Sequence, residues 1–258
     1  MAQENKFEKL LITTNPAMRT VPPELRIRVW RRLAVNRIHS FMYVRIPKAA
    51  NSTVTLTLAR MLFPDKTEQL VHDVQGKVAR KLFSTPEPLR HFGARAFRRG
   101  LRTFSFFRNP YTRLLSAYLD KLCSDENRDS YQWVAQAAGY ADNSEMTFER
   151  FVEYLEKGRN VYSNIHWAPQ TAICPIAIDR LDLIGQLENL EGDLERLTGL
   201  LLGKPSPVTV LSREQNRQGA QSKLQRYYTP QLMGRVHHLY AEDFTALGYD
   251  PAPETYLG

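Results

Sequence analysis

Two short segments of the sequence carry side chains that could bind phosphate groups. In the first, IPKAANSTV at residues 46–54, a short apolar run leads through Lys48 into a segment with helical periodicity. The first N–H groups of a helix lack intrahelical partners and form the positive end of its dipole, so they attract anions. A lysine adds positive charge at such a site, small side chains let the backbone approach the anion closely, and hydroxyl groups donate hydrogen bonds to it. The residues expected to bind an anion are Lys48, Ala49, Ala50, Asn51, Ser52 and Thr53.

The second segment is FSFFRNPYTRLLSAY at residues 104–118. Arg108 ends an apolar run typical of a buried strand, and Asn109 and Pro110 favour the start of a helix. A guanidinium group can make two parallel hydrogen bonds to a phosphate monoester, and Ser116 offers a hydroxyl further along that helix. These features predict a second phosphate site with Arg108 and Ser116. An arginine paired with an acidic neighbour is the alternative here, and a capped helix with an exposed lysine is the alternative at Lys48.

The elements that would position these residues alternate between strands and helices. Apolar and β-branched runs predict strands at 41–46, 103–107 and 181–187. Periodicity and capping residues predict helices at 23–37, 52–63, 110–122, 148–156, 190–202 and 230–248, with a polar loop at 124–146. This order is typical of an α/β domain with a central parallel sheet flanked by helices. Ligands of such sheets bind beyond the carboxyl ends of strands, where both candidate sites lie.

The helix predicted at 110–122 has two different faces. Its polar residues Arg113, Ser116 and Asp120 recur at helical spacing on one face. We expect the apolar stripe on the opposite face, formed by Leu115, Tyr118 and Leu122, to contact the core.

The composition is that of a globular protein with a basic surface. The 258 residues are 43% hydrophobic, and the formal net charge is +8. The basic excess favours an anionic partner, and arginines cluster at 26–37 and 95–102. Cys123 and Cys174 fit neither a CxxC nor a zinc-binding spacing, so we expect free thiols and no metal site. The sequence shows no signal peptide and no apolar stretch of about 18 residues, which predicts a cytoplasmic protein without a membrane span.

The two segments together resemble those of sulfotransferase family 2, which includes carbohydrate sulfotransferases acting on chondroitin, dermatan and the HNK-1 epitope. In that family a Pro-Lys pair followed by small and hydroxyl residues binds the 5′-phosphosulfate of 3′-phosphoadenosine 5′-phosphosulfate (PAPS). The family pattern R-x-P-x-x-R-L-x-S-A-Y, which binds the 3′-phosphate, is similar to residues 108–118. The segments HWAPQTAIC at 166–174, DLIGQLENLEGDL at 182–194 and YAEDFTALGYD at 240–250 also resemble family segments.

The resemblance implies a single domain with the P-loop-like sulfotransferase fold. Residues 41–258 would form the sulfotransferase domain, preceded by an N-terminal extension and basic helix at 1–40. The implied reaction transfers the sulfuryl group of PAPS to an acceptor hydroxyl by in-line attack, without a metal, and the expected acceptor is a saccharide. Lys48 and the N–H groups of residues 49–53 would hold the 5′-phosphosulfate, and Arg108 and Ser116 would hold the 3′-phosphate.

The reaction also needs a base to accept the proton of the acceptor hydroxyl, and histidine suits this role near neutral pH. His91 lies between the two motifs, where related heparan-type enzymes carry a histidine base. His166, in a His-Trp pair, is the second candidate, and an acidic residue within 64–90 remains open.

Two departures from the family and two alternative functions remain. Animal members carry an N-terminal anchor and often a C-x-P-C segment. This chain has Cys174 at that place without the second cysteine, so we expect a soluble bacterial member.

A P-loop-type kinase is one alternative function, although the glycine-rich signature G-x-x-x-x-G-K-[ST] is missing from this sequence. A non-enzymatic module that binds a polyanion is the other. With PAPS as the expected nucleotide partner, we expect no nucleic-acid partner.

Overall fold

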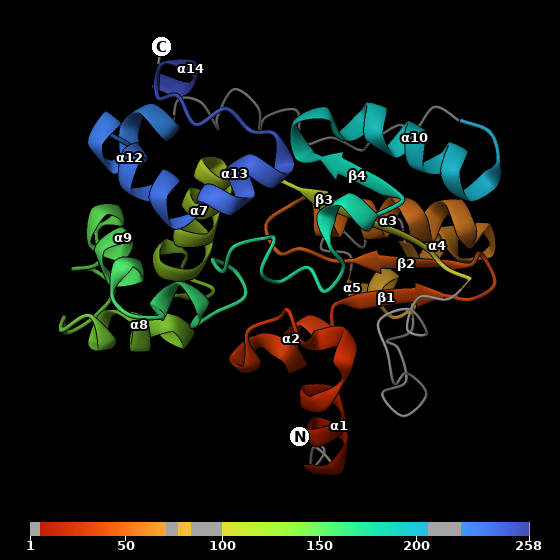
Figure 1. Ribbon diagram of the computed structural model, residues 1–258, viewed down its shortest axis with the longest axis horizontal. Coiled ribbons are helices and arrows are strands. Elements are labelled where there is room, and N and C mark those ends of the chain that lie inside the picture. The colour runs from red at the N-terminus through yellow and green to blue at the C-terminus, as the bar shows by residue number, and fades with distance from the viewer. Residues whose placement is uncertain (1–5, 71–76, 84–99, 206–222, 258) are drawn as a thin grey trace. The chain divides into compact units, whose positions relative to one another are not determined.

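The computed structural model describes residues 6–70, 77–83, 100–205 and 223–257 (Figure 1). The chain divides into two compact units. Unit 1 consists of Met1–Arg108 and Gln170–Ser212, and unit 2 consists of Asn109–Pro169 and Arg213–Gly258. The expected boundary at residue 40, between an extension and the main domain, stays a prediction.

Unit 1 is built on a four-stranded sheet. In spatial order its strands are β1 (Leu33–Asn36), β2 (Phe41–Val44), β3 (Arg102–Phe107) and β4 (Leu183–Gln186). β1 runs antiparallel to β2, whereas β2, β3 and β4 are parallel neighbours. All of β2 and nearly all of β3 are buried, as expected for strands covered on both faces. The α/β class and the three predicted strands are therefore confirmed.

Two helices of unit 1 pack on one face of this sheet. α3 (Asn51–Leu62) and α10 (Leu190–Leu202) match the predicted helices closely. Val54 and Leu58 of α3 share a buried cluster with Leu194 of α10 and with Tyr43 and Phe104 of the sheet. Aromatic side chains dominate the contact, because β-branched and aromatic residues fit a pleated surface. The other described helices of unit 1 are α1 (Lys6–Thr14), α2 (Arg26–Trp30), α4 (Thr67–Leu70) and α5 (Lys77–Arg80).

The helix predicted at 23–37 is wrong beyond residue 30. α2 ends at Trp30, and Leu33–Asn36 form the fully buried edge strand β1. The turn after α2 is held by Arg45, which donates from Nε to the Arg32 carbonyl and from Nη2 to the Arg31 carbonyl. Pairing with β2 therefore overrides the helical periodicity of this segment.

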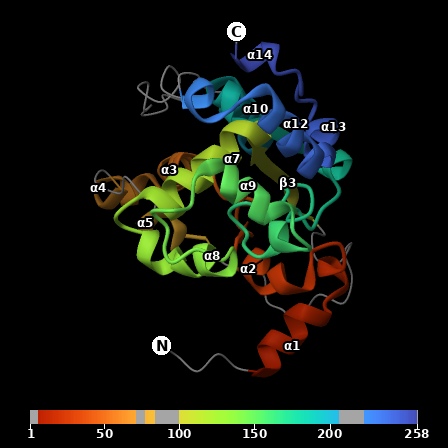
Figure 2. The same cartoon turned by 90° about the vertical axis from the view of Figure 1, so that its left-hand side faces the viewer.

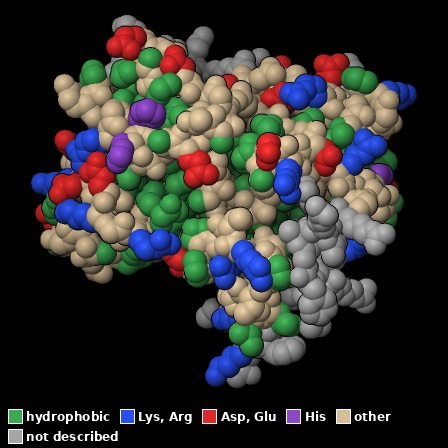
Figure 3. Space-filling view, in the orientation of Figure 1, with side chains coloured by type: hydrophobic (Ala, Val, Ile, Leu, Met, Phe, Trp, Pro, Cys, Tyr) green, Lys and Arg blue, Asp and Glu red, His purple; other side chains and the backbone are tan. Residues whose placement is uncertain are grey.

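The basic cluster at 26–37 is partly structural. Arg26 donates to the carbonyls of Thr13 and Val21, which fastens α2 to the segment before it. Arg32 donates to the carbonyl of Arg28. Figure 3 shows basic side chains over the N-terminal helices and a mixture of basic and acidic side chains elsewhere on the face drawn. In the second arginine cluster, at 95–102, Arg102 donates to the Leu200 carbonyl. Residues 95–99 of that cluster lie outside the described residues.

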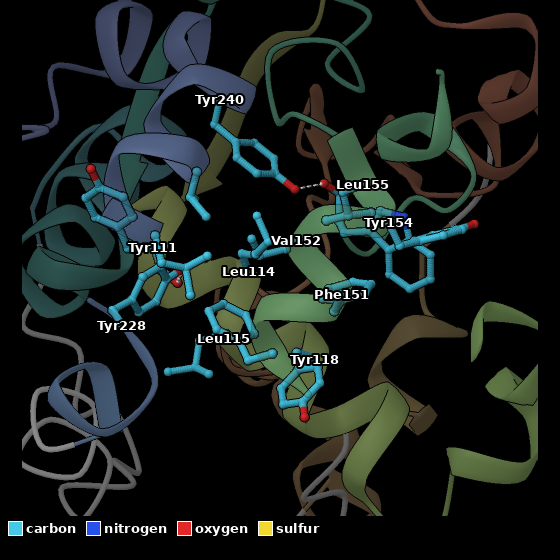
Figure 4. Packing of buried hydrophobic residues seen from close by; sticks show 14 of the residues in the cluster. Tyr111, Leu114, Leu115, Tyr118, Phe151, Val152, Tyr154, Leu155, Tyr228 and Tyr240 are labelled. Atoms are coloured by element: carbon cyan, nitrogen blue, oxygen red, sulfur yellow. Dashed lines mark hydrogen bonds between the residues drawn. The ribbon is translucent and has the colours of Figure 1, made fainter. Parts of the chain in front are cut away.

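Unit 2 is helical. Its helices are α7 (Pro110–Tyr118), α8 (Gln132–Ala137), α9 (Phe148–Glu156), α12 (Pro230–Leu239), α13 (Ala241–Leu247) and α14 (Glu254–Leu257). α7, α9 and α12 pack against one another, and both views show them side by side (Figures 1 and 2). Figure 4 shows how tyrosine, phenylalanine and leucine side chains of these segments fill the core between them. The predicted core stripe Leu115, Tyr118 and Leu122 is buried in this cluster.

Three predictions in unit 2 need correction. The helix predicted to 122 changes to a π-helical turn at Leu119–Cys123. The segment predicted as a loop at 124–146 contains α8. The helix predicted at 230–248 breaks at Tyr240, whose hydroxyl donates to the Trp167 carbonyl at 2.6 Å. The bond from Tyr240 is a tertiary contact that the local sequence does not reveal.

A buried hydroxyl in the core of unit 1 gives a first testable prediction. The Tyr43 hydroxyl is buried without a hydrogen-bond partner among the described residues, and burial raises its pKa. Because an unsatisfied buried hydroxyl destabilises the folded state, Tyr43→Phe should leave the free energy of unfolding unchanged or raise it by about 1 kcal/mol. Urea denaturation would measure this change.

The matched control is Tyr118→Phe. The Tyr118 hydroxyl donates to the Met146 carbonyl at 2.8 Å, so its removal should lower the free energy of unfolding by about 1 kcal/mol. A loss at Tyr43 as large as the loss at Tyr118 would contradict the prediction.

Candidate functional site

The two predicted phosphate-binding segments meet at one edge of the sheet in unit 1. β2 and β3 are parallel, with Val44 aligned to Ser105, so their carboxyl ends emerge together. The Ser105 hydroxyl donates to the Val44 carbonyl at 2.8 Å and links the two strands there. Beyond the strands, Nη1 of Arg108 donates to the Lys48 carbonyl at 3.4 Å. The structure thus brings Lys48 and Arg108 together, as predicted from the strand order.

The loop that carries Lys48 has an unusual backbone. Lys48 and Ala50 have φ values of 66° and 57°, in the left-handed region that favours glycine, whereas Ala49 between them has a negative φ. A non-glycine residue in this region costs about 1 kcal/mol or more, and such strain is concentrated at functional sites. Two left-handed residues so close together turn the chain sharply in front of the start of α3.

The helix that follows this loop starts without a side-chain cap. Ala50 is the N-cap residue of α3 and cannot accept a hydrogen bond through its side chain. By contrast, Asn109, Thr147 and Thr229 cap α7, α9 and α12 through their side chains. The first N–H groups of α3 are therefore not covered by a cap, which suits an anion.

The other residues predicted for this loop differ in exposure. Ala49 is fully buried, whereas Lys48 and the residues Asn51, Ser52 and Thr53 are half-buried. The amide oxygen of Asn51 accepts from the Thr55 hydroxyl at 3.2 Å, so this side chain supports the first turn of α3. The hydroxyls of Ser52 and Thr53 remain candidates for contact with an anion.

Arg108 is held by a residue that the sequence analysis did not single out. The side-chain amide of Gln170 accepts from the Arg108 N–H at 3.0 Å and donates to the Arg108 carbonyl at 2.8 Å. Gln170 lies within the segment HWAPQTAIC, which resembles a family segment. Neither the type of this residue nor its distance from Arg108 along the sequence indicates that the two are in contact.

Ser116, the predicted partner of Arg108, belongs to unit 2. It is half-buried within α7, the helix that begins two residues after Arg108. Asn109 caps this helix by accepting from the N–H groups of Tyr111 and Thr112, as predicted. The joint role of Arg108 and Ser116 stays a prediction.

Arg113 is buried, although its spacing in the helix predicted at 110–122 places it with Ser116 and Asp120, opposite the apolar stripe. Its side chain is 1% exposed, and it donates to the carbonyls of Ala168 at 2.8 Å and Ile165 at 3.3 Å. Burial lowers the pKa of its guanidinium group, while the nearby Asp243, itself fully buried, acts in the opposite direction. Arg113 therefore fixes the segment that carries His166.

The geometry around His166 determines which ring nitrogen is basic. One oxygen, Oδ1 of Asn164, lies 3.0 Å from the His166 N–H and 2.8 Å from Nδ1 of its ring. The backbone N–H can only donate, so this atom is the amide oxygen, and Nδ1 must carry the ring proton. Nε2 is then the ring nitrogen that carries the lone pair of the neutral imidazole. The Tyr131 hydroxyl, 3.4 Å from Nδ1, flanks the ring.

The other predicted base, His91, lies outside the described residues. Its role therefore stays a prediction, as does that of an acidic residue within 64–90.

Both cysteines are free thiols, as predicted. Cys174 is buried, which raises its pKa to about 12, and Cys123 is exposed. In the part of the chain that the structure describes, no three His, Cys, Asp or Glu side chains gather as a metal site requires. Among the described helices, none is both long and apolar enough to span a membrane.

Comparison with known proteins places these features in a family context. The profile of the Sulfotransferase family matches residues 31–250. Carbohydrate sulfotransferase 14 of Danio rerio is 29% identical over 259 residues, which cover 92% of this chain and 66% of that protein. Its human counterpart of the same name is 28% identical over 190 residues, covering 69% of this chain and 48% of that protein. Human carbohydrate sulfotransferase 8 is 24% identical over 246 residues, which cover 84% of this chain and 55% of that protein.

These matches confirm the resemblance that the two motifs indicated. The chain spans between about half and two thirds of the length of these relatives. No solved structure matches the chain.

Proposed function

Because the chain belongs to the Sulfotransferase family, we propose that it transfers the sulfuryl group of PAPS to a hydroxyl of an acceptor. Family membership implies PAPS as the donor. The observation that carries the proposal is the meeting of Lys48 and Arg108 at the carboxyl ends of two parallel strands. PAPS carries phosphate groups at both ends of its ribose, so it needs two separate anion sites close together.

The residues at this edge fit the two ends of the donor. Lys48 and the N–H groups of residues 49–53 would hold the 5′-phosphosulfate, supported by the left-handed backbone at Lys48 and Ala50 and the uncapped start of α3. Arg108 would hold the 3′-phosphate, assisted by the Ser116 hydroxyl. A glycine-free loop fits a short cradle around one phosphosulfate group better than a loop that wraps a triphosphate.

The chemistry assigned to these residues is electrostatic and acid–base. As the acceptor oxygen bonds to sulfur, the bond to the bridging oxygen of the nucleotide breaks, and negative charge develops on that oxygen. Lys48 would stabilise this charge, a contribution that is larger in the transition state than in the ground state. His91 and His166 are the two candidates to accept the proton of the acceptor hydroxyl, and in His166 the contact between Nδ1 and Asn164 assigns that role to Nε2.

A saccharide is the acceptor class we propose. Its support is the names of the relatives, carbohydrate sulfotransferases 14 and 8, which describe those proteins. A screen of hydroxyl acceptors with isotopically labelled PAPS, read by mass spectrometry, would identify the acceptor. Transfer only to lipids, phenols or tyrosine would overturn this part of the proposal.

Nucleotide-dependent stabilisation tests the proposal directly. Adenosine 3′,5′-bisphosphate (PAP), the product of the donor, should raise the melting temperature by about 5–10 °C at a hundredfold excess over its dissociation constant. ATP with magnesium should not, because the second phosphate of PAP lies at the 3′ position, where we assign Arg108. A shift with ATP and magnesium alone would favour the kinase alternative. Binding without saturation and with steep salt dependence would favour the polyanion-binding module.

A further inference from the structure

We propose that Gln170 is a positioning residue that holds Arg108 in place for the 3′-phosphate of the donor. This inference rests on the proposed function. The side chain of Gln170 is 0% exposed, and both polar atoms of its amide contact the backbone of Arg108, as acceptor at 3.0 Å and as donor at 2.8 Å. A buried amide with two reciprocal bonds has one orientation and little freedom to move.

The position of Arg108 explains why such a clamp is needed. The pairing of β3 with β4 ends at Phe107, which is aligned with Gln186, the last residue of β4. Arg108 is the next residue and lies just beyond that ladder. The Gln170 amide supplies the acceptor and the donor that a strand residue would have supplied, so it extends the ladder by one residue.

Fixing this backbone fixes the direction of the guanidinium group. Nη1 of Arg108 donates to the Lys48 carbonyl at 3.4 Å, so its side chain links the end of β3 to the loop at residues 45–50 between β2 and α3, called the lysine loop below. A shift of the Arg108 backbone would be passed along the side chain to its charged end. Gln170 would thus act on the nucleotide through Arg108, without touching it.

The test compares two nucleotides that differ only in the 3′-phosphate. In Gln170→Leu, the affinity for PAP should fall by about 10- to 100-fold, because the guanidinium group is no longer held in place. The affinity for adenosine 5′-phosphate, which lacks the 3′-phosphate, should change less than about twofold, since the lysine loop is intact. Isothermal titration on the full chain would measure both.

A double variant separates positioning from general support of the fold. In an Arg108→Ala background, Gln170→Leu should cause no further loss of PAP affinity, because the residue through which it acts is missing. Gln170→Met keeps the length of the side chain but can neither accept from the Arg108 N–H nor donate to the Arg108 carbonyl, so it should also weaken the binding of PAP. This variant decides the question if the leucine variant does not fold.

The outcomes distinguish the inference from the function on which it rests. Wild-type protein that fails to bind PAP would overturn the proposed function and the inference together. If the wild type binds PAP, equal loss of PAP and adenosine 5′-phosphate affinity in Gln170→Leu would indicate a general structural role and overturn the inference. PAP affinity at the wild-type level in Gln170→Met would overturn it as well.

Discussion

Replacing Lys48 with alanine should lower the rate of sulfuryl transfer at saturating donor by about 100- to 1000-fold, the usual effect of removing one group that stabilises developing charge. The reason is that Lys48 lies in the loop at the end of β2, next to Arg108, where charge would develop on the leaving nucleotide. Alanine accepts the left-handed backbone no worse than lysine does. The measurement is the steady-state release of PAP in the presence of acceptor.

A glycine variant at the same position provides the matched control. Because Lys48 has a φ of 66°, Lys48→Gly should relieve backbone strain and leave the free energy of unfolding unchanged or higher by up to about 1 kcal/mol. It should nevertheless lose transfer as severely as Lys48→Ala. A glycine variant that retains more than about a tenth of the wild-type rate would show that the charge of Lys48 is not used.

Replacing Arg113 with methionine should lower the free energy of unfolding by about 3–5 kcal/mol, the range for breaking a buried charge pair. The substitution leaves the Asp243 carboxylate buried without its nearby cation and removes the donors to the carbonyls of Ala168 and Ile165. Urea denaturation followed by tryptophan fluorescence would measure the change, since the buried Trp167 is adjacent to these carbonyls.

Two further variants show whether the pair is the cause. Arg113→Met combined with Asp243→Leu should recover part of the lost free energy of unfolding, because removing both charges destabilises the fold less than leaving one buried charge without the other. The exposed Arg226, replaced with methionine, should change the free energy of unfolding by no more than about 0.5 kcal/mol. A loss below about 1 kcal/mol in Arg113→Met would contradict the role assigned to this residue.

Much of the architecture could be predicted from the sequence because the signals are local. The aromatic runs of β2 and β3, the N-cap at Asn109 and the periodicity of α9 need no knowledge of distant residues. The adjacency of Lys48 and Arg108 could also be predicted. It follows from the rule that parallel strands present their carboxyl ends at one edge of a sheet.

The failures occur where a distant contact overrides the local signal. The segment Leu33–Asn36 forms a strand because it pairs with β2, although its periodicity suits a helix. The spacing in the helix predicted at 110–122 groups Arg113 with Ser116 and Asp120, and it does not show that Asp243 and two backbone carbonyls lie near the buried guanidinium group.

The residues that support the site could not be identified from the sequence either. Gln170 and Asn164 each act on one partner through their amide groups, and neither contact follows from residue type or spacing. The left-handed backbone of the lysine loop was missed because the residues that adopt it are lysine and alanine, whereas glycine is the usual signal.

We propose that the lysine loop and Arg108 form one nucleotide site at the edge of the sheet. Isothermal titration of PAP into the wild-type protein and into Arg108→Ala tests this, with far-ultraviolet circular dichroism to check the fold. We expect one saturable site in the wild type and a loss of affinity of about 100-fold or more in the folded variant. Failure of the wild type to bind PAP, or equal affinity in Arg108→Ala, would contradict it.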